Sequence, residues 1–120
     1  MAEISAENYE KYLDVVTIID NKLLNIKKDT AHSSNLSKII YHEDFEYLVD
    51  NFGNKLVSYL IHDMTHKGCS WVHLHLLGYI TKTNPVPEEH AGKFYHQIAD
   101  WINWYLNSIY YPHHIYHDLV

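Results

Sequence analysis

The chain is poor in the residues that constrain a backbone, since its 120 residues include one cysteine, four glycines and three prolines. Cys69 alone cannot form a disulfide within the chain, so nothing indicates an oxidising compartment. With so few glycines there is no Gly-rich loop to hold a phosphate, and nucleotide-dependent chemistry is not expected. No stretch approaches the roughly 18 apolar residues of a membrane span, and the N-terminus lacks the basic segment of a signal peptide. We therefore expect a cytoplasmic protein that does not act in a membrane.

Basic residues are also scarce, with nine lysines or arginines against 15 acidic residues and a formal net charge of −6. A negative surface repels phosphate backbones, so autonomous binding of nucleic acid is not expected. The same charge attracts a basic protein partner and speeds its association. Charge alone, however, favours nothing more than ordinary solubility.

Apolar residues at helical spacing are abundant. Hydrophobic residues make up 47% of the chain, which is enough for one packed core without a metal or a disulfide. Residues 3–28 carry an apolar side chain every three or four positions, and Ser5 is a suitable N-cap. No segment alternates with period two for long, and no hairpin signal occurs. The predicted helices are residues 3–28, 42–52, 55–66, 70–81 and 89–108, with a loop at 29–37 and a left-handed C-cap at Gly68.

These elements predict an all-α fold of about five antiparallel helices in a single domain, residues 1–120. Because the four later helices are consecutive and similar in length, we expect them to stack as HEAT-like hairpins. Residues 1–40 would form an N-terminal helix and loop, 42–109 the core, and 110–120 a tail of unassigned structure. The aromatic residues of the last helix predict burial against several neighbours, and Trp71, Leu74, Leu77 and Tyr79 are expected to point inward.

Residues 81–92, TKTNPVPEEHAG, interrupt the helical pattern and are named here the NPVP connector. Two prolines stop helix extension and hold the chain extended. Val86 is expected to pack into the core. The negative charges of Glu88 and Glu89 are favourable near the N-terminus of the next helix. Gly92 is expected to permit the close approach of a neighbouring helix.

Residues 42–104 resemble a known group of proteins. The matching pieces are HEDFEYLVDNFGNKLVSYL, then Trp71 with Leu76 and Leu77, then YITKTNPVPEEHAGKFYHQIADWINW. They are similar to small, mostly uncharacterised bacterial proteins related to HEAT-like helical repeats, with the pattern ITGxNPVP…G…WxxW. Lys82 stands where that group has glycine, which puts the geometry of this turn in question. The resemblance covers about half the chain, and it implies a helical fold without an established reaction or catalytic residues.

The segment LIHDMTHKG, residues 60–68, offers a metal-site alternative. Adjacent His62 and Asp63 resemble the HD step of metal-dependent phosphohydrolases, and His62 and His66 have the i, i+4 spacing that chelates zinc. Such a site needs an earlier histidine on a preceding helix, and His42 lies only twenty residues upstream. Since His62 falls on the polar side of its helix, two solvent-facing histidines are the favoured interpretation.

Other histidines and the cysteine admit structural explanations. On a helix, His73 and His75 lie about 200° apart, so they cannot share an ion; one is expected near the core with a hydrogen bond and the other at the surface. Cys69 is expected to be a small, half-buried residue. The C-terminal cluster of His113, His114 and His117 with nearby tyrosines is interpreted as a docked or frayed tail, with a metal site or a protein-binding surface as alternatives.

We therefore predict a protein-binding module, namely an immunity protein or antitoxin that covers the active site of a toxin such as a basic nuclease. No enzymatic activity, cofactor, metal or small-molecule substrate is expected. Alternatives are the metal-dependent phosphohydrolase of His62 and Asp63 and a scaffold subunit without inhibitory role. The predicted partner-binding residues are acidic side chains on solvated faces and tyrosines of the tail: Glu43, Asp44, Glu46, Asp50, Glu88, Glu89, Tyr110, Tyr111 and Tyr116.

Overall fold

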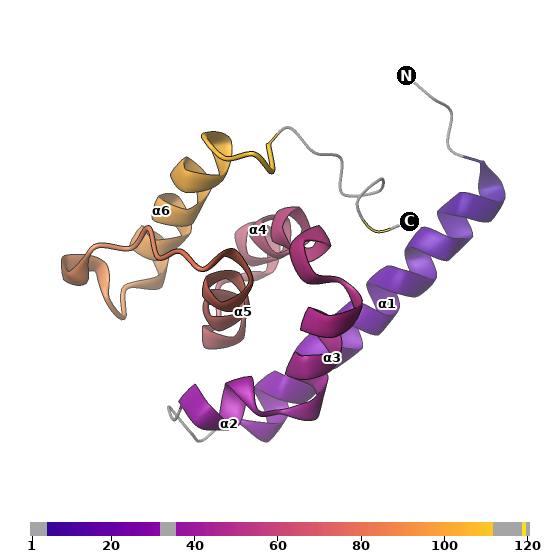
Figure 1. Ribbon diagram of the computed structural model, residues 1–120, viewed down its shortest axis with the longest axis horizontal. Helices are drawn as coiled ribbons and strands as arrows, with labels where there is room; N and C mark the ends of the chain where they lie inside the picture. The colour runs from indigo at the N-terminus through magenta and orange to yellow at the C-terminus, as the bar shows by residue number, and fades with distance from the viewer. Residues whose placement is uncertain (1–4, 32–35, 112–118, 120) are drawn as a thin grey trace.

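In the computed structural model (Figure 1), the described residues, 5–31, 36–111 and 119, form helices and connecting turns with no strand among them. The order is α1 (Ala6–Asp29), α2 (Leu36–Ile40), α3 (Glu43–Asn51), η1 (Gly53–Lys55), α4 (Leu56–Lys67), α5 (Trp71–Thr81), η2 (Glu88–His90) and α6 (Phe94–Leu106). The prediction of an all-α fold is confirmed, whereas HEAT-like stacking stays a prediction. No helix in these described ranges combines the length and apolar character needed to cross a bilayer.

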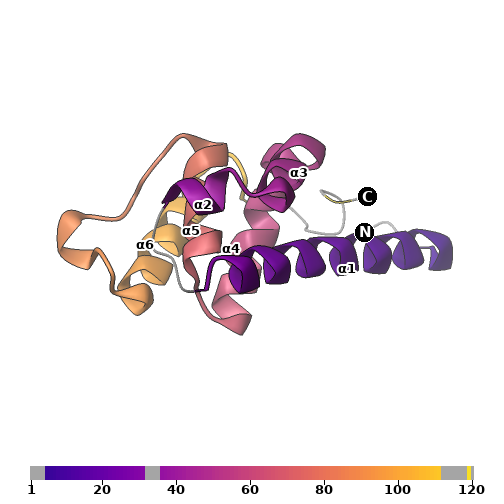
Figure 2. The same ribbon diagram turned by 90° about the horizontal axis from the view of Figure 1, so that it is seen from below.

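The long helix α1 supplies one side of the core. Ser5 caps it as predicted, because its side chain accepts a hydrogen bond from the backbone N–H of Asn8 at 3.1 Å. Ile19, Leu23 and Ile26 are buried in the same hydrophobic cluster as the side chains of α3, α4 and α5. The core is therefore not confined to residues 42–109. The N-terminal half of α1 extends beyond α3 and α4 (Figures 1 and 2).

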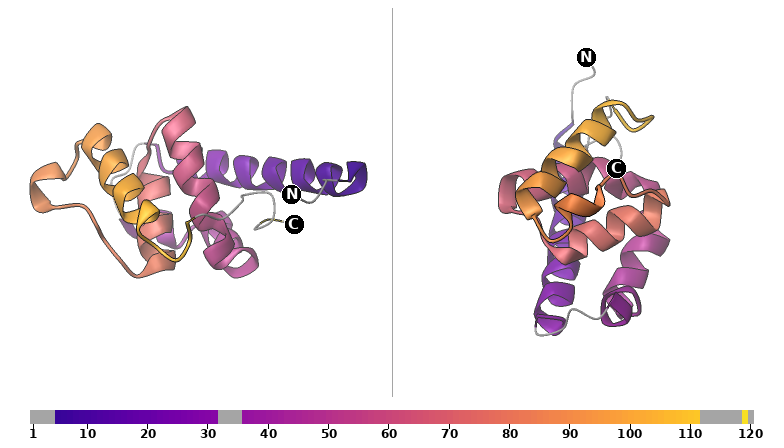
Figure 3. Two further views of the ribbon diagram at one scale, coloured as in Figure 1. Left: turned by 90° about the horizontal axis from the view of Figure 1, so that it is seen from above. Right: turned by 90° about the vertical axis from the view of Figure 1, so that its left-hand side faces the viewer.

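Helix α4 runs through the middle of the molecule, with α1 and α3 on one side and α6 on the other (Figures 1 and 3). The predicted stripe of Leu56, Leu60 and Met64 is confirmed, since all three are fully buried. Every residue from 56 to 61 is buried as well. This first half of α4 is buried on all sides, so it carries apolar residues beyond one stripe, which explains the neighbouring Val57 and Ile61.

Two helix predictions need correction. Residues 36–40, assigned to a loop or left unassigned from the sequence, form the short helix α2, which packs Ile39 into the core against α5. Helix α6 begins at Phe94 rather than at residue 89. Gly92 has a φ of 78°, which no α-helix contains, so the preceding residues form only the single turn η2. Gly92 does not serve close packing, because a Cβ atom placed there would meet nothing within 4 Å.

The expected orientation of the aromatic residues is also partly wrong. Trp71 is 46% exposed and Tyr79 is 47% exposed, although both were expected inside; Leu74 and Leu77 are buried as predicted. In α6, Trp101 and Gln97 are buried, whereas the other aromatic side chains remain half-buried or exposed. The reason is the position of α6 at the edge of the molecule, where it packs mainly on α4 (Figure 1).

Backbone geometry explains the turns at both ends of α5. Gly68 has a positive φ as predicted, but its φ of 100° and ψ of 146° are not left-handed helical. Lys82, at the end of α5, has φ 58° and ψ 30°, which is the left-handed conformation that glycine adopts without a steric cost. Lys82 is the one non-glycine residue with a positive φ among the residues that the structure describes. Its ammonium group lies 4.8 Å from the ring centre of Tyr79.

Replacing Lys82 with glycine should stabilise the protein. Relief of the left-handed strain is worth about 1 kcal/mol, and the lost cation–π contact and the greater freedom of the unfolded chain reduce the net gain to about 0.5 kcal/mol. Urea denaturation measures the change. Lys82→Ala is the matched control, because it removes the same contact but keeps a Cβ atom, and it should be destabilising. A loss of stability in Lys82→Gly would contradict the strain at this turn.

Candidate functional site

Three of the predicted acidic residues lie together on the outer face of α3. Glu43, Glu46 and Asp50 are exposed and follow the i, i+3, i+7 spacing of one helical face, and we name them the α3 acidic stripe. None of them forms an ion pair with another part of the chain that the structure describes. Tyr47 lies on the same face and is 38% exposed, and Tyr41, just before α3, is 81% exposed. Neither tyrosine was predicted as a partner-binding residue, although the i, i+4 spacing of Glu43 and Tyr47 indicates that Tyr47 lies on this face.

Asp44 does not belong to this exposed surface, and its prediction as a partner-binding residue on a solvated face is wrong. The residue is buried, and its carboxylate accepts hydrogen bonds from Lys22 Nζ at 3.0 Å and from Asn25 Nδ2 at 3.1 Å. Burial alone would raise the pKa of Asp44, but the hydrogen bonds from Lys22 and Asn25 and the lysine charge hold it below its ordinary value. Asp44 therefore fastens α3 to α1.

The remaining partner-binding residues lie elsewhere. Glu88 and Glu89 are exposed in η2, at the left-hand end of the molecule in Figures 1 and 2 and away from α3. Tyr110 is half-buried against Trp104, and its hydroxyl donates to Asn54 Oδ1 at 3.2 Å. Tyr111 is exposed and contacts Tyr105 edge-to-face.

Four residues of the predicted C-terminal cluster, namely His113, His114, Tyr116 and His117, lie outside the described residues. The predicted residues that the structure does describe do not form one continuous surface. The α3 acidic stripe is the largest group that lies together.

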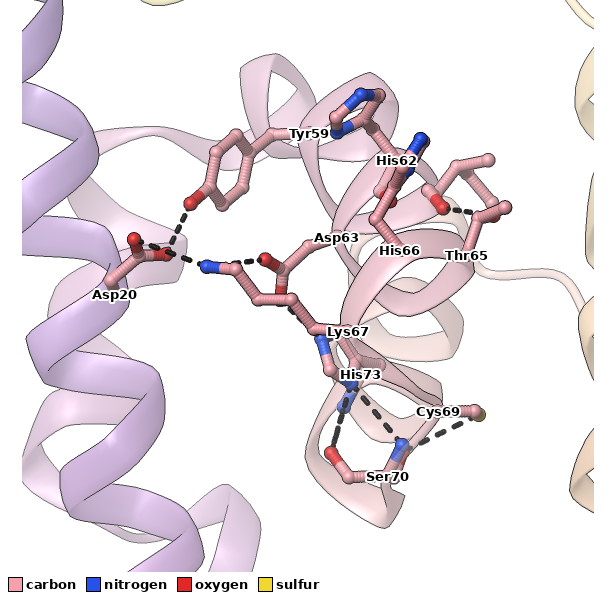
Figure 4. A network of polar contacts seen from close by, with 11 residues as sticks. Asp20, Tyr59, His62, Asp63, Thr65, His66, Lys67, Cys69, Ser70 and His73 are labelled. Atoms are coloured by element: carbon pink, nitrogen blue, oxygen red, sulfur yellow. Dashed lines mark hydrogen bonds and ion pairs between the residues drawn. The ribbon is translucent and has the colours of Figure 1, made fainter.

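The histidines of α4 are arranged as the favoured interpretation predicts. His62 and His66 are exposed, and their rings stack at 4.0 Å between centres. Asp63, between them in sequence, is buried and points toward α1 rather than toward the two rings (Figure 4). Within the ranges that the structure describes, no three potential ligand side chains converge on a point that suits a metal ion. A phosphohydrolase-type metal site that uses both His62 and Asp63 therefore has little geometric support.

Asp63 is instead the centre of a buried polar network (Figure 4). Its carboxylate accepts from His73 Nε2 at 2.7 Å and from Lys67 Nζ at 3.1 Å. Lys67 also reaches Asp20 of α1 at 3.3 Å, and the hydroxyl of Tyr59 donates to the same Asp20 carboxylate. Burial would raise the pKa of Asp63, but the hydrogen bonds from His73 and Lys67 outweigh burial and lower it. The network joins α1, α4 and α5.

His73 is held through both of its ring nitrogens. The backbone N–H of Ser70 donates to its Nδ1 at 3.2 Å, so Nδ1 carries no proton, and Nε2–H donates to Asp63. The prediction of one core histidine with a hydrogen bond is confirmed for His73. Its companion His75 is half-buried and stacks on Trp71, and burial lowers its pKa.

Ser70, His73 and Asp63 have the hydrogen-bond order of a nucleophile, a base and an orienting carboxylate, which the sequence analysis did not anticipate. Ser70 Oγ lies 2.9 Å from His73 Nδ1. The same serine caps α5, because its Oγ accepts the backbone N–H of His73 in a capping box. Ser70 is not among the residues that line the cleft described below. We therefore assign the trio to the stability of the α4–α5 hairpin.

Cys69, which precedes Ser70, is half-buried as predicted. Burial raises the pKa of its thiol to about 11. A thiol with such a pKa is almost entirely protonated near pH 7, and the thiolate is the reactive form. Cys69 is accordingly unsuited to act as a nucleophile.

A cleft of about 660 Å³ lies between α5, the NPVP connector and the start of α6. The connector leaves the end of α5, swings outward and returns to α6 (Figure 3). Val86 is half-buried and packs on the core, as predicted. The cleft is lined chiefly by apolar and aromatic side chains, including Trp71, Leu74, Tyr79, Val86, Pro87 and Trp101.

No family model, curated protein or solved structure matches the chain. The resemblance of residues 42–104 to HEAT-like proteins therefore stays a prediction. Support for a function comes from the chain's own surface and cavities. Two features stand out: the α3 acidic stripe with its tyrosines, and the apolar cleft beside the NPVP connector.

Proposed function

We propose that the protein is a protein-binding module whose α3 acidic stripe docks on a basic surface of its partner. In this proposal it acts as an immunity protein or antitoxin that covers the active site of a toxin. The observation that carries the proposal is the set of three exposed carboxylates, without ion pairs in the described chain, on one face of one helix. Carboxylates steer a basic partner toward this face, and tyrosines supply contact area.

Lys22, which lies beside Tyr47 of this face, supports the proposal because its charge is directed elsewhere. Lys22 Nζ lies 3.0 Å from Asp44 Oδ1 and 4.6 Å from the ring centre of Tyr47. Its charge is thus matched by the buried Asp44, and the carboxylates of the stripe keep theirs. The result is a local negative potential on the outer face of α3.

Helix α3 is also held firmly, which favours docking without loss of conformational freedom. At its start, His42 Nδ1 accepts the backbone N–H of Asp44 at 3.0 Å, and His42 Nε2 lies 2.7 Å from Asp29 of α1. On its inner face, Phe45 and Leu48 are buried in the core. The stripe is therefore presented on a rigid support.

Two charge-reversed variants test the docking surface. Affinity capture on the wild-type protein supplies the partner, and stopped-flow mixing of the two purified proteins measures the association rate. We expect Glu46→Lys/Asp50→Lys to slow association by at least about tenfold at low ionic strength, with a smaller effect in physiological salt. The reason is the loss of attraction at the docking face itself.

Glu88→Lys/Glu89→Lys is the matched control, because it changes the net charge equally at a site away from α3. We expect it to slow association by less than about twofold. Equal slowing by both pairs would mean that only net charge matters. Slowing by the control pair alone would move the docking surface to η2. Either result overturns the role of the α3 acidic stripe.

The inhibitory role needs its own measurement. The captured partner, produced alone in a host cell, should stop growth, and co-production of this protein should restore growth. The Glu46→Lys/Asp50→Lys variant should restore growth poorly. A partner that is harmless on its own would contradict the immunity function and leave a scaffold role.

A further inference from the structure

The cleft beside the NPVP connector has the size and lining of a small-molecule site. Its volume of about 660 Å³ lies within the range of roughly 300 to 1,000 Å³ that is typical of ligand pockets. Buried side chains of Leu74, Gln97 and Trp101 form its floor, and the exposed rings of Trp71 and Tyr79 stand at its rim. Flat aromatic walls of this kind favour a planar ligand.

Two of the buried side chains that line the cleft carry a polar group without a partner among the described residues. Gln97 is 5% exposed, and its Nε2 donates to the backbone oxygen of His90 at 3.2 Å, but its side-chain oxygen receives no hydrogen bond. Trp101 is 2% exposed, and its indole N–H donates to no acceptor. Buried polar groups are nearly always hydrogen-bonded, so a ligand that satisfies both would gain affinity.

The hydrogen-bonding character of these two groups indicates the ligand edge that would satisfy them. Gln97 and Trp101 are four residues apart on α6, so they are neighbours on one face of the helix. One offers an acceptor and the other a donor. Adjacent N–H and C=O groups, as found in a cyclic amide, provide the complementary pair. Lys82 and Glu88, at the rim, carry opposite charges. A ligand without net charge is therefore favoured.

We propose that this cleft binds an uncharged, planar aromatic lactam, whose N–H donates to the Gln97 side-chain oxygen and whose C=O accepts from the Trp101 indole N–H. The ring system lies between the aromatic side chains of α5 and the NPVP connector. This assignment revises the expectation that the protein has no small-molecule ligand. It stands independently of the α3 acidic stripe, which lies elsewhere on the molecule.

Nuclear magnetic resonance titration with 2-quinolinone, a bicyclic lactam, tests the proposal. The indole N–H signals of Trp71, Trp101 and Trp104 report binding separately. We expect a saturable shift of the Trp101 signal with a Kd of roughly 10 to 300 µM, and no comparable shift of Trp104, which does not line the cleft. No saturable shift of Trp101 up to about 1 mM would overturn the proposal.

Control measurements isolate the lactam contacts. N-methyl-2-quinolinone lacks the N–H donor and should bind at least about tenfold more weakly to the wild-type protein. Gln97→Leu should weaken 2-quinolinone by a similar factor. Equal binding of the methylated compound would overturn the recognition of the lactam edge, whether or not the leucine variant folds.

A third variant tests the location. A Cβ atom on Gly78 would have its nearest neighbour, the Thr83 backbone oxygen, at 3.8 Å, which is an ordinary contact distance. The backbone therefore accepts a side chain at this position. Because Gly78 lines the cleft, the leucine side chain of Gly78→Leu adds its volume at the cleft wall. The substitution also replaces a glycine inside α5 with a good helix former. We expect it to abolish the Trp101 shift while the circular dichroism spectrum stays that of the wild type. Undiminished binding in this folded variant would place the ligand outside the cleft.

Discussion

Asp63→Ala should lower the free energy of unfolding by about 3 to 5 kcal/mol, one of the two largest effects that we expect from a single substitution. The variant leaves the Nε2–H group of the fully buried His73 without its acceptor, 2.7 Å away in the wild type. It also removes one of the two carboxylates that hold Lys67. Because the network joins α1, α4 and α5, its loss loosens the middle of the molecule. Urea denaturation followed by circular dichroism measures the change.

A double variant separates the Asp63–His73 interaction from the separate contributions of the two side chains. Asp63→Leu/His73→Leu removes both polar groups and puts apolar side chains in a buried site, so it should cost clearly less than the sum of the two single leucine variants. The remaining cost includes the capping-box contact of Ser70, which His73 also makes. Strict additivity of the two single substitutions would contradict a direct Asp63–His73 interaction.

The pH dependence of the Asp63→Asn variant supplies a second check. The folded-state pKa of Asp63 lies below its ordinary value, so the unfolded chain takes up the proton first as the pH falls. The stabilisation by the ionised carboxylate is therefore complete above about pH 4 and is lost as the pH falls through the lowered pKa. The difference in unfolding free energy between wild type and variant should shrink below about pH 4. A difference that grows on acidification would contradict the direction of the shift.

The sequence predicted most of the helices because their signals are local. Apolar spacing, the Ser5 and Ser70 caps and the prolines of the NPVP connector all act within a few residues, and the corresponding helices lie within three residues of their predicted bounds except at the start of α6. There, the left-handed backbone of Gly92 ends any helix that begins earlier. Helix α2 was missed because its five residues are too short to show a period.

The site was harder to predict, because its interactions connect distant parts of the chain. Asp44 stands among acidic neighbours, but its partner Lys22 lies on another helix, 22 residues away. A helical projection places Asp44 about 100° from Glu43 and on the same side as the buried Leu48. The sequence therefore indicated the burial of Asp44, although not its pairing with Lys22. The pairing of His73 with Asp63 and the shape of the cleft depend on how helices and connector pack. Neither has a local sequence signature.

Phe45→Ala should lower the free energy of unfolding by about 3 to 5 kcal/mol. Phe45 is the largest side chain of α3 in the core and is almost completely buried. Its ring meets that of Tyr79 edge-to-face, with 5.5 Å between ring centres. Truncation leaves a cavity between α3 and α5 that the surrounding helices fill only in part.

The same substitution connects stability to the proposed docking. Helix α3 carries the acidic stripe on its outer face and Phe45 on its inner face, so a loosened α3 should associate with the partner more slowly even where the protein remains folded. Phe45→Leu is the matched control, because it keeps most of the volume and should cost less than about 1.5 kcal/mol. Tyr79→Ala removes the aromatic contact from the α5 side, where the ring is half exposed, and should also cost less than Phe45→Ala. An alanine variant at Phe45 as stable as the leucine variant would mean that α3 is not packed through this ring, and the rigid support of the acidic stripe would lose its physical basis.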